Sequence, residues 1–444
     1  MALVMSNAIA NWWRSQQFKS ALKGGNTQLA IKLLQEIKKS GAKFSWLEKL
    51  FRDKLQLESY SQQDKREVAN LSFKLTEAVQ QLENLNTEVA FDKQDSFILK
   101  PEAEFINFVS KAFKLIEHDV NKLQSTSLDE RIFDDFEARL VEYIKEEFSR
   151  IPDNKLKIKI EDALEDINSL KSGQDPDYRF SLTPHVYFMK YFLENVYCIY
   201  LAWFLIYKAG LLPTKINILD IAAGPGTVAY GLALFLQSTS GFFDIPQMHI
   251  SYYSLEKQDA FQFRGLQFWR RYIESRKTPV NAYFRFVTDD IFTWNTESSN
   301  IPKDFFDFIT ISHCFFNTSV KSLQANNIYK QIFATRLKPQ GYVLLVVQDK
   351  KLFKAYDAYQ VEDHEQEKKV VNKFLAELGL ELVWYKYLTS TDSRTPYSAA
   401  EFAKFAKDKL SKQLYMSSMI QKYLGQKYQQ HYSLDDYVIL AKKS

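Results

Sequence analysis

Glycine is scarce in this chain and unevenly distributed. Only 13 of the 444 residues are glycine, which is about 3% against a typical ~7%. None lies between Gly41 and Gly173, whereas Gly224, Gly226 and Gly231 fall within eight residues. Because glycine is unfavourable inside helices, the long gap predicts a helix-rich region. The cluster marks a turn with special backbone requirements.

Cysteine is scarcer still, and long apolar runs are missing. Cys198 and Cys314 stand far apart, which excludes a disulfide-stapled scaffold and a cysteine-rich metal cluster. The most apolar run, 197–207, is about half of the ~20 residues that a membrane span needs, so we expect no membrane partner. The first residues lack a basic segment before an apolar core. We therefore expect no secretory signal and a cytoplasmic location.

Neither sign of charge dominates. The chain has 58 Lys and Arg against 54 Asp and Glu, and 46% of its residues are hydrophobic, as is typical of globular proteins. Residues 1–50 carry a net charge of +6, residues 51–175 carry −9, and the rest carries +7. A net acidic region without a strip of Arg, Lys and aromatic residues argues against a nucleic-acid partner.

The spacing of apolar residues changes near residue 175. Before it, segments such as 29–37 and 133–148 have helical spacing. After residue 212, short apolar runs alternate with helical stretches, which is typical of a parallel α/β sheet. We expect an all-helical domain over 1–175 that recognises the substrate, and an α/β domain over 176–444 with a helical insertion at about 389–433. The predicted strands are 217–222, 250–255, 283–287, 305–312, 342–348, 380–387 and 436–441.

The first predicted strand runs into the glycine cluster. The sequence from Ile218 reads Ile-Leu-Asp-Ile-Ala-Ala-Gly-Pro-Gly-Thr-Val-Ala-Tyr-Gly, which is a strand, a turn and a helix. Such a turn lets the backbone approach a ligand, and the helix N-terminus offers unpaired N–H groups and a positive dipole end. We expect a nucleotide-like ligand at the carboxyl ends of the strands. The pattern G-x-G-x-x-A also fits a dinucleotide-binding fingerprint. A dinucleotide therefore stays an alternative ligand.

Six elements in sequence order resemble the class I S-adenosylmethionine-dependent methyltransferases over residues 178–444. The turn is similar to motif I of that family, with Ala222 in place of the first glycine. The acids of Tyr253-Ser-Leu-Glu and Phe286-Val-Thr-Asp-Asp-Ile-Phe are similar to those that end the next two strands. Segments beginning at Phe306, Leu337 and Asp435 resemble motif IV, the fifth strand and the antiparallel seventh strand. The resemblance implies a Rossmann-like α/β fold with a seven-stranded methyltransferase sheet.

The resemblance also implies the cofactor S-adenosyl-L-methionine. In that family the acid corresponding to Glu256 binds the ribose hydroxyls, and the one corresponding to Asp290 lies near the adenine amino group. Taken singly, both acids also fit ordinary helix caps or turns. The full implied set of cofactor contacts is Asp220, Ala222, Gly224, Pro225, Gly226, Glu256, Asp290, Ile291 and Ser312.

His313 is the histidine predicted at the carboxyl end of a central strand. We expect it to act as a general base, with a packed structural histidine as the alternative. Asn317, His185 and Tyr187 are the predicted substrate contacts. Cys314 lacks the Pro-Cys context of RNA cytosine methyltransferases and is expected to be a small buried residue. The sequence shows no cluster of metal ligands, so no metal is expected.

The predicted function follows from what the motifs contain and omit. Motif IV lacks an Asn/Asp-Pro-Pro pattern, which disfavours adenine N6 and glutamine N5 as acceptors. The Gly-Pro-Gly-Thr turn is similar to that of the ribosomal small-subunit methyltransferase-like family, but the additional cysteines of that family are missing. We expect an O- or N-methyltransferase acting on a peptide, protein or natural-product acceptor, and a homodimer stays open. The alternatives are an inactive methyltransferase-like binding or assembly protein and an RNA methyltransferase.

Overall fold

The chain divides into two compact units, Met1–Gln94 and Asp95–Ser444. In the first unit, α2 (Thr27–Lys39) buries Ala30, Leu33 and Leu34 in a small core with Phe18 and Ala21. This computed structural model describes residues 13–18, 20–21, 27–40, 98–168, 178, 180–242, 248–276, 280–293, 301–315, 319–358, 363–427 and 429–444.

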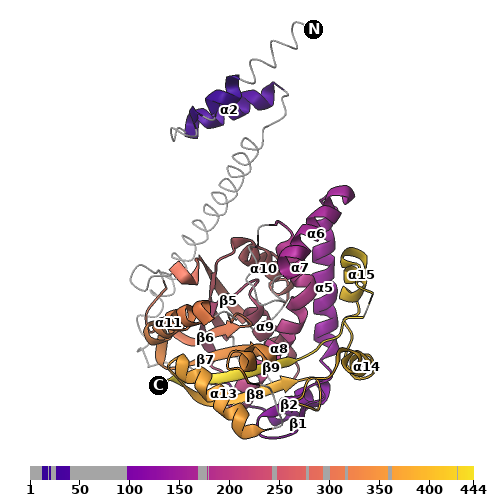
Figure 1. Ribbon diagram of the computed structural model, residues 1–444, viewed down its shortest axis with the longest axis vertical. Coiled ribbons are helices and arrows are strands. Elements are labelled where there is room, and N and C mark those ends of the chain that lie inside the picture. Colours follow the sequence, from indigo (N-terminus) through magenta and orange to yellow (C-terminus); the bar gives the residue numbers. More distant parts are fainter. Residues whose placement is uncertain are drawn as a thin grey trace, which may run out of the picture. The chain divides into compact units, whose positions relative to one another are not determined.

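A mixed sheet forms the centre of the second unit (Figure 1). The strand order is β1-β2-β8-β9-β7-β6-β3-β4-β5. Strands β3 to β7 are mutually parallel, and β9 lies antiparallel between β7 and β8. The predicted Rossmann-like α/β fold with an antiparallel last strand is confirmed. The strands are β1 (Ile116–Glu117), β2 (Lys122–Gln124), β3 (Lys215–Ile221), β4 (Met248–Glu256), β5 (Val280–Thr288), β6 (Phe306–Ser312), β7 (Leu337–Gln348), β8 (Leu380–Thr389) and β9 (Asp435–Lys443).

Among the described residues the sheet has nine strands, whereas the sequence predicts seven. The hairpin β1–β2 extends it, with β2 parallel to β8 so that Lys122 is opposite Tyr387. Strands of two and three residues are too short to show the alternation by which a strand is recognised in a sequence. They also lie in the region that was predicted to be all-helical.

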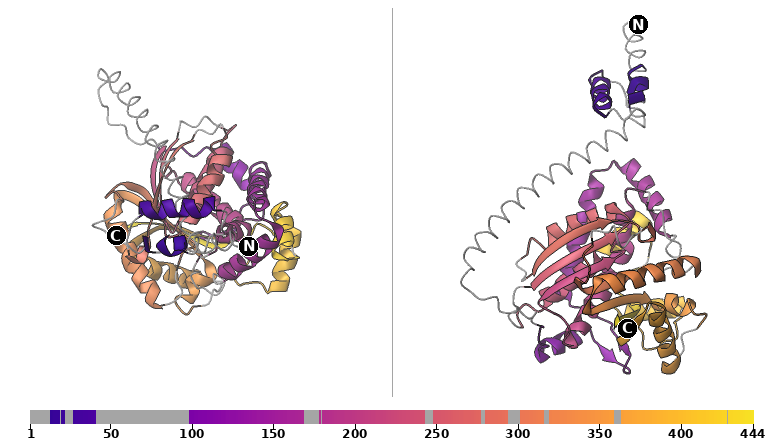
Figure 2. Two further views of the ribbon diagram at one scale, coloured as in Figure 1. Left: turned by 90° about the horizontal axis from the view of Figure 1, so that it is seen from above. Right: turned by 90° about the vertical axis from the view of Figure 1, so that its left-hand side faces the viewer.

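Helices cover both faces of the sheet (Figure 2). One face packs against α8 (Leu193–Lys208), α9 (Thr227–Ser238) and α10 (Asp259–Tyr272), and the other against α11 (Ser319–Arg336) and α13 (His364–Glu377). No helix among the described residues is long and apolar enough to cross a membrane. The other helices are α4 (Ala103–Ala112), α5 (Glu130–Ser149), α6 (Asp153–Asn168), α7 (Thr183–Tyr187), the π-helix η2 (Phe188–Phe192), the 3-10 helix η3 (Ile291–Thr293), α12 (Asp349–Lys354), α14 (Ala399–Lys409) and α15 (Met416–Leu424).

The helices that precede β3 in sequence share the core of the sheet. Side chains of α4, α5 and α6 are buried in the same cluster as those of α8 and α9. Phe136 of α5, for example, packs against Tyr230 of α9 and Phe268 of α10. The division between compact units therefore falls between Gln94 and Asp95, which differs from the predicted boundary near residue 175. The apolar face of α5 is buried against sheet-covering helices and not within a separate bundle.

Helices α14 and α15 lie between β8 and β9, within the span predicted as an insertion. The buried carboxylate of Glu137 on α5 accepts hydrogen bonds from the backbone N–H groups of Tyr415 and Met416, both at 2.7 Å. The hydroxyl of Tyr432 donates to its other oxygen at 3.3 Å. Burial raises the pKa of Glu137 to about 7, although these hydrogen-bond donors by themselves lower it. One buried carboxyl group thus ties the insertion to α5.

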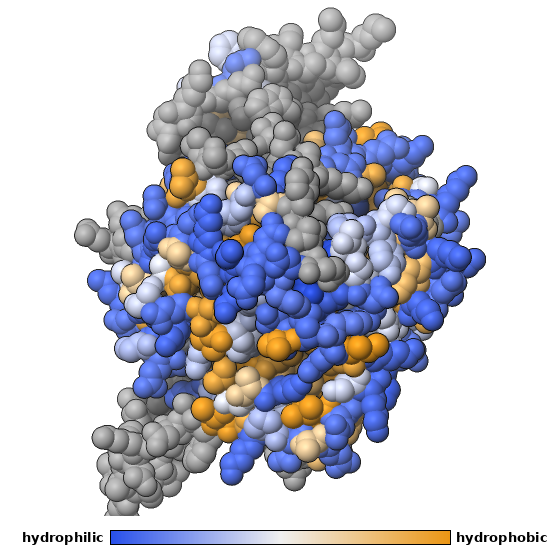
Figure 3. Space-filling model, turned by 60° about the horizontal axis from the view of Figure 1, so that its bottom comes forward, coloured by the Kyte–Doolittle hydropathy of each residue, from blue (hydrophilic) through white to orange (hydrophobic). Residues whose placement is uncertain are grey.

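Apolar side chains remain exposed at both edges of the sheet. Ile116 and Val120 of the β1–β2 hairpin and Tyr283 of β5 are 51%, 82% and 66% exposed. On the face shown in Figure 3, apolar side chains gather in the lower half of the view among hydrophilic ones.

Candidate cofactor and acceptor site

The loop after β3 contains three residues in the left-handed backbone conformation. Their φ angles are +55° for Ala222, +54° for Gly224 and +85° for Gly226. Gly226 caps α9, and its N–H donates to the carbonyl of Ala223 at 2.9 Å. For a residue with a Cβ this conformation costs about 1–2 kcal/mol. The predicted turn is present, and its alanine is strained.

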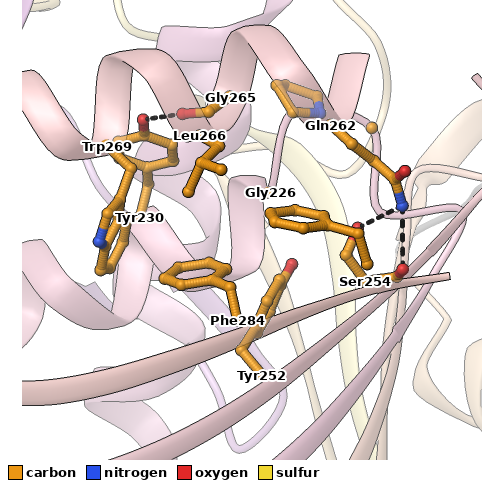
Figure 4. Close-up of a pocket in the computed structure, with 12 residues that line it drawn as sticks. Gly226, Tyr230, Tyr252, Ser254, Gln262, Gly265, Leu266, Trp269 and Phe284 are labelled. Atoms are coloured by element: carbon orange, nitrogen blue, oxygen red, sulfur yellow. Dashed lines mark hydrogen bonds between the residues drawn. The ribbon is translucent and has the colours of Figure 1, made fainter. Parts of the chain in front are cut away.

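Helix α10 packs directly against this loop (Figure 4). A Cβ at Gly265 would lie 2.1 Å from the carbonyl oxygen of Pro225, so only glycine fits there. The hydroxyl of Tyr230 donates to the carbonyl of Gly265 at 2.8 Å. In contrast, a Cβ at Gly224 would meet no described atom within 4 Å. The loop is therefore closed against α10 at Pro225 and approachable at Gly224.

A small aromatic pocket lies between the loop and α10 (Figure 4). Trp269 and Phe284 pack edge to face with ring centres 4.7 Å apart. The side-chain amide of Gln262 donates to the carbonyl and hydroxyl oxygens of Ser254 at 3.0 and 3.1 Å. These contacts join α10 to β4 and β5. The lining consists of Gly224, Pro225, Gly226, Tyr230, Tyr252, Ser254, Gln262, Gly265, Leu266, Trp269, Phe284 and Phe286.

Asp220 lies buried beneath the loop and is only 1% exposed. Its carboxyl group accepts hydrogen bonds from the hydroxyl of Thr310 at 2.7 Å and from the phenol of Tyr252. Burial raises the pKa of Asp220 to about 7 despite these donors. Asp220 therefore links β3 to β4 and β6.

Glu256, at the end of β4, is hydrogen-bonded to the loop. Its Oε2 atom accepts from the N–H of Gly224 at 2.8 Å, and its Oε1 atom accepts from the N–H of Gln258 at 2.9 Å. The side chain is half-buried, and each of its carboxylate oxygens has two lone pairs. The structure thus brings together Gly224 and Glu256, two of the predicted cofactor contacts.

Asp290 follows β5 and forms an ion pair with Lys257 at 2.9 Å. Burial opposes its ionisation, but the N–H of Phe292 and the ammonium of Lys257 hold the pKa of Asp290 below its usual value. Ile291 is buried at the start of η3. Since Lys257 directly follows Glu256, the acid-bearing ends of β4 and β5 are joined at one edge of the sheet.

The two aromatic candidates on α7 have different surroundings. Burial raises the pKa of the Tyr187 phenol, and the nearby charge of Glu256 adds to the rise. His185 is 1% exposed and packs against Tyr143 and Phe148 of α5. Burial, followed by the charge of Arg264, lowers the pKa of His185 to about 3. Tyr187 therefore lies beside the candidate site. The side chain of His185 is buried and cannot be contacted by an acceptor.

His313 follows β6 in a left-handed conformation, with φ +59°. Its Nδ1 atom is 2.7 Å from the hydroxyl oxygen of Ser312, and its Nε2 atom is 3.2 Å from a carboxylate oxygen of Asp436. Both ring nitrogens are thus engaged. Asn317, the other polar candidate on this segment, lies outside the described residues.

Sequence reasoning missed several residues that build this site. Gly265 has a signal in hindsight, because it is a glycine inside an aromatic-rich helix of a glycine-poor chain. Tyr252 and Thr310 are ordinary strand residues, and nothing in the sequence points to their bonds with Asp220. Cys198 and Asp436 belong to α8 and β9, and only the fold brings them to His313.

Comparison with known proteins finds similarity to solved structures only. No protein-family model and no curated protein matches the chain. A SAM-dependent methyltransferase from Methanosarcina mazei is 17% identical, covering 52% of this chain and 94% of its own, with a TM-score of 0.30. A putative S-adenosyl-L-methionine-dependent methyltransferase from Methanococcus maripaludis is 14% identical (59% and 90% covered, TM-score 0.26). The 16S rRNA methyltransferase KamB is 9% identical (52% and 88%, TM-score 0.30).

These similarities are too low to assign a family or an activity. The fold class therefore rests on the strand order of the sheet itself, with its parallel centre and antiparallel last strand.

Proposed function

We propose that this chain is an S-adenosyl-L-methionine-dependent methyltransferase that acts on an oxygen or nitrogen of a peptide, protein or natural-product acceptor. The observation that carries the proposal is the hydrogen bond from the N–H of Gly224 to Glu256. This bond holds a carboxylate against the glycine-rich loop. The loop belongs to a sheet whose last strand is antiparallel. The resemblance of the sequence motifs supports the same cofactor.

The residues at the strand ends fit this cofactor chemically. Gly224 leaves open space above the loop, where a Cβ would have no described neighbour. Glu256 would accept the two ribose hydroxyls with its two carboxylate oxygens, because a vicinal diol offers two donors and each oxygen can accept more than one hydrogen bond. Asp290, held ionised by Lys257, would accept from an amino group of the base. The positive end of α9 begins at the same loop.

When bound, S-adenosylmethionine supplies an electrophilic methyl group, and positioning of the acceptor then provides much of the rate. Ser312 and His313 stand at the carboxyl end of β6 and would receive the proton of an acceptor hydroxyl or amine. In this role Ser312 would relay the proton to Nδ1 of His313, while Asp436 stabilises the charged ring. Tyr187 would line the edge where the acceptor enters.

The acceptor would be recognised by elements outside the sheet. The segments α7, η2 and α8 lead from α6 to β3 and carry Tyr187 beside Glu256. Residues 1–175 are proposed to contribute to acceptor recognition, in a cytoplasmic setting and without a nucleic-acid partner. A homodimer is compatible with this arrangement.

Incubation of the purified full-length chain with methyl-labelled S-adenosylmethionine tests the proposal. Separate pools of peptides, proteins, small metabolites and RNA are offered, and the label is located by mass spectrometry. We expect label on an oxygen or nitrogen in one of the first three pools. Label on RNA alone would establish the RNA alternative, and cofactor binding without any label would establish a binding protein. Binding of NAD(H) instead of S-adenosylmethionine would contradict the proposal.

A further inference from the structure

Three side chains that are far apart in the sequence meet at the carboxyl edge of the sheet. They are Cys198 on α8, His313 after β6 and Asp436 in β9. One potential ligand atom from each lies within 4.8 Å of those of the other two. Cys198 and Asp436 are buried, and His313 is partly exposed. A sulfur, a nitrogen and an oxygen donor therefore surround one point close to the surface.

We propose that Cys198, His313 and Asp436 bind a single divalent transition-metal ion of the zinc class. Thiolate, imidazole and carboxylate are the three ligand types that zinc takes in proteins, and three protein ligands leave one position open. In a tetrahedral site with bonds of ~2.0–2.3 Å the ligand atoms are roughly 3.3–3.8 Å apart. Rotations of the side chains that close the present spacing by about 1 Å would suffice.

One of the two neutral tautomers of His313 leaves a place for a cation at this point. If Nδ1–H donates to the hydroxyl of Ser312, the lone pair of Nε2 faces the carboxylate oxygen of Asp436 at 3.2 Å. Two electron-rich atoms at this distance need a proton or a metal ion between them. Metal-bound histidines commonly donate their second ring N–H to a neighbouring group in this way, and Ser312 is in position to accept it.

The backbone holds the ligands in place from three elements. The N–H of His313 donates to the carbonyl of Val346 at 2.8 Å, which fixes the turn after β6 against β7. Asp436 is paired on both sides, opposite Gln348 of β7 and Leu388 of β8. Cys198 sits in the middle of α8, which is buried along its length. Such rigid support is what a preformed site requires.

This site does not depend on methyl transfer, and it gives His313 a different role. A histidine whose Nε2 atom holds a metal ion and whose Nδ1–H donates to Ser312 has no site left for a proton. It is a ligand in the metal-bound chain and acts as the proposed base only in the metal-free chain. The open fourth position would take a water molecule or another oxygen donor.

Cobalt titration of the metal-free full-length chain tests the inference. Because the chain has two cysteines, the Cys314→Ser variant retains Cys198 as its sole thiol. We expect this variant and the wild type to bind one Co²⁺ ion per chain with a thiolate-to-cobalt charge-transfer band, and Zn²⁺ to displace it. Cys198→Ser should abolish the band, and His313→Gln or Asp436→Asn should weaken binding. Ser312→Ala should weaken it about 10–100-fold, as loss of a supporting hydrogen bond does.

Circular dichroism shows whether each variant folds. The Cys314→Ser protein keeps the test decisive even if Cys198→Ser does not fold, because a band in it can come only from Cys198. Absence of the band in folded wild type and Cys314→Ser protein would overturn the metal site. Cobalt binding that His313→Gln and Asp436→Asn leave unchanged would overturn it as well.

Discussion

Ala222 occupies a left-handed position in the loop, where a glycine has no steric cost. Ala223, the next residue, is not left-handed and is buried. We expect Ala222→Gly to raise the free energy of unfolding by up to about 1 kcal/mol, because relief of the strain exceeds the added entropy of the unfolded chain. Ala223→Gly should lower it by about 0.5–1 kcal/mol. Chemical denaturation of both variants gives the comparison, and equal shifts would contradict the conformation of the loop.

Gly265 is the closest approach of α10 to the loop. A methyl group there must displace the backbone of Pro225, since the two atoms would lie 2.1 Å apart. We expect Gly265→Ala to remain folded but to bind S-adenosylmethionine at least about tenfold more weakly, measured by equilibrium dialysis. Arg270→Ala, on the exposed side of the same helix, is the matched control and should bind normally. Unchanged binding by Gly265→Ala would show that the loop does not hold the cofactor.

At the scale of elements, Glu137 links α5 to the start of α15 and makes this contact sensitive to pH. Its folded pKa of about 7 exceeds the ordinary value of 4.5, so the folded state keeps a proton that the unfolded chain releases. The resulting stability is complete below pH 4.5 and is lost as the pH rises through 7. Glu137→Gln should therefore show a smaller fall in the free energy of unfolding between pH 5 and pH 8 than the wild type.

The exposed Glu142 on the same helix provides the control for this measurement. Glu142→Gln should retain the pH dependence of the wild type. Identical pH profiles for Glu137→Gln and the wild type would show that Glu137 does not hold the extra proton.

Arg394 joins the β1–β2 hairpin to α13. It is 2% exposed and pairs with Asp119 at 2.8 Å and with the buried carboxylate of Glu367. Arg394→Ala leaves two carboxylates without this partner, and we expect it to lower the free energy of unfolding by about 3–5 kcal/mol. Arg139→Ala removes exposed ion pairs on α5 and should change stability little. Similar unfolding midpoints for the two variants would contradict the importance of this buried contact.

On the scale of the whole molecule, the sequence predicted what depends on local pattern and missed what depends on distant contacts. The alternation of apolar runs after residue 212 predicts the α/β sheet, because each run is long enough to show its period. The glycine spacing predicts the loop and its left-handed glycines, but not the left-handed conformation of Ala222. The hairpin β1–β2 was missed because its strands are too short to show an alternating pattern. The packing of α5 on α9 and α10 was missed because an amphipathic pattern does not indicate which element a helix packs against.

The site divides in the same way. Gly224 and Glu256 were predicted from motifs, and the structure places them in contact. The meeting of Cys198, His313 and Asp436 follows from the order of the strands, because β9 returns beside β7 to the edge where β6 ends. The spacing of these three residues along the chain does not predict that they lie close together.

Calorimetric titration with S-adenosylmethionine tests the central claim most directly. We expect the wild type to bind one molecule per chain, and Glu256→Gln to bind it about tenfold or more weakly, as for loss of a hydrogen bond to a charged group. Glu274→Gln, an exposed control, should match the wild type. Absence of heat with the folded wild type, or equal affinity of Glu256→Gln, would contradict the account.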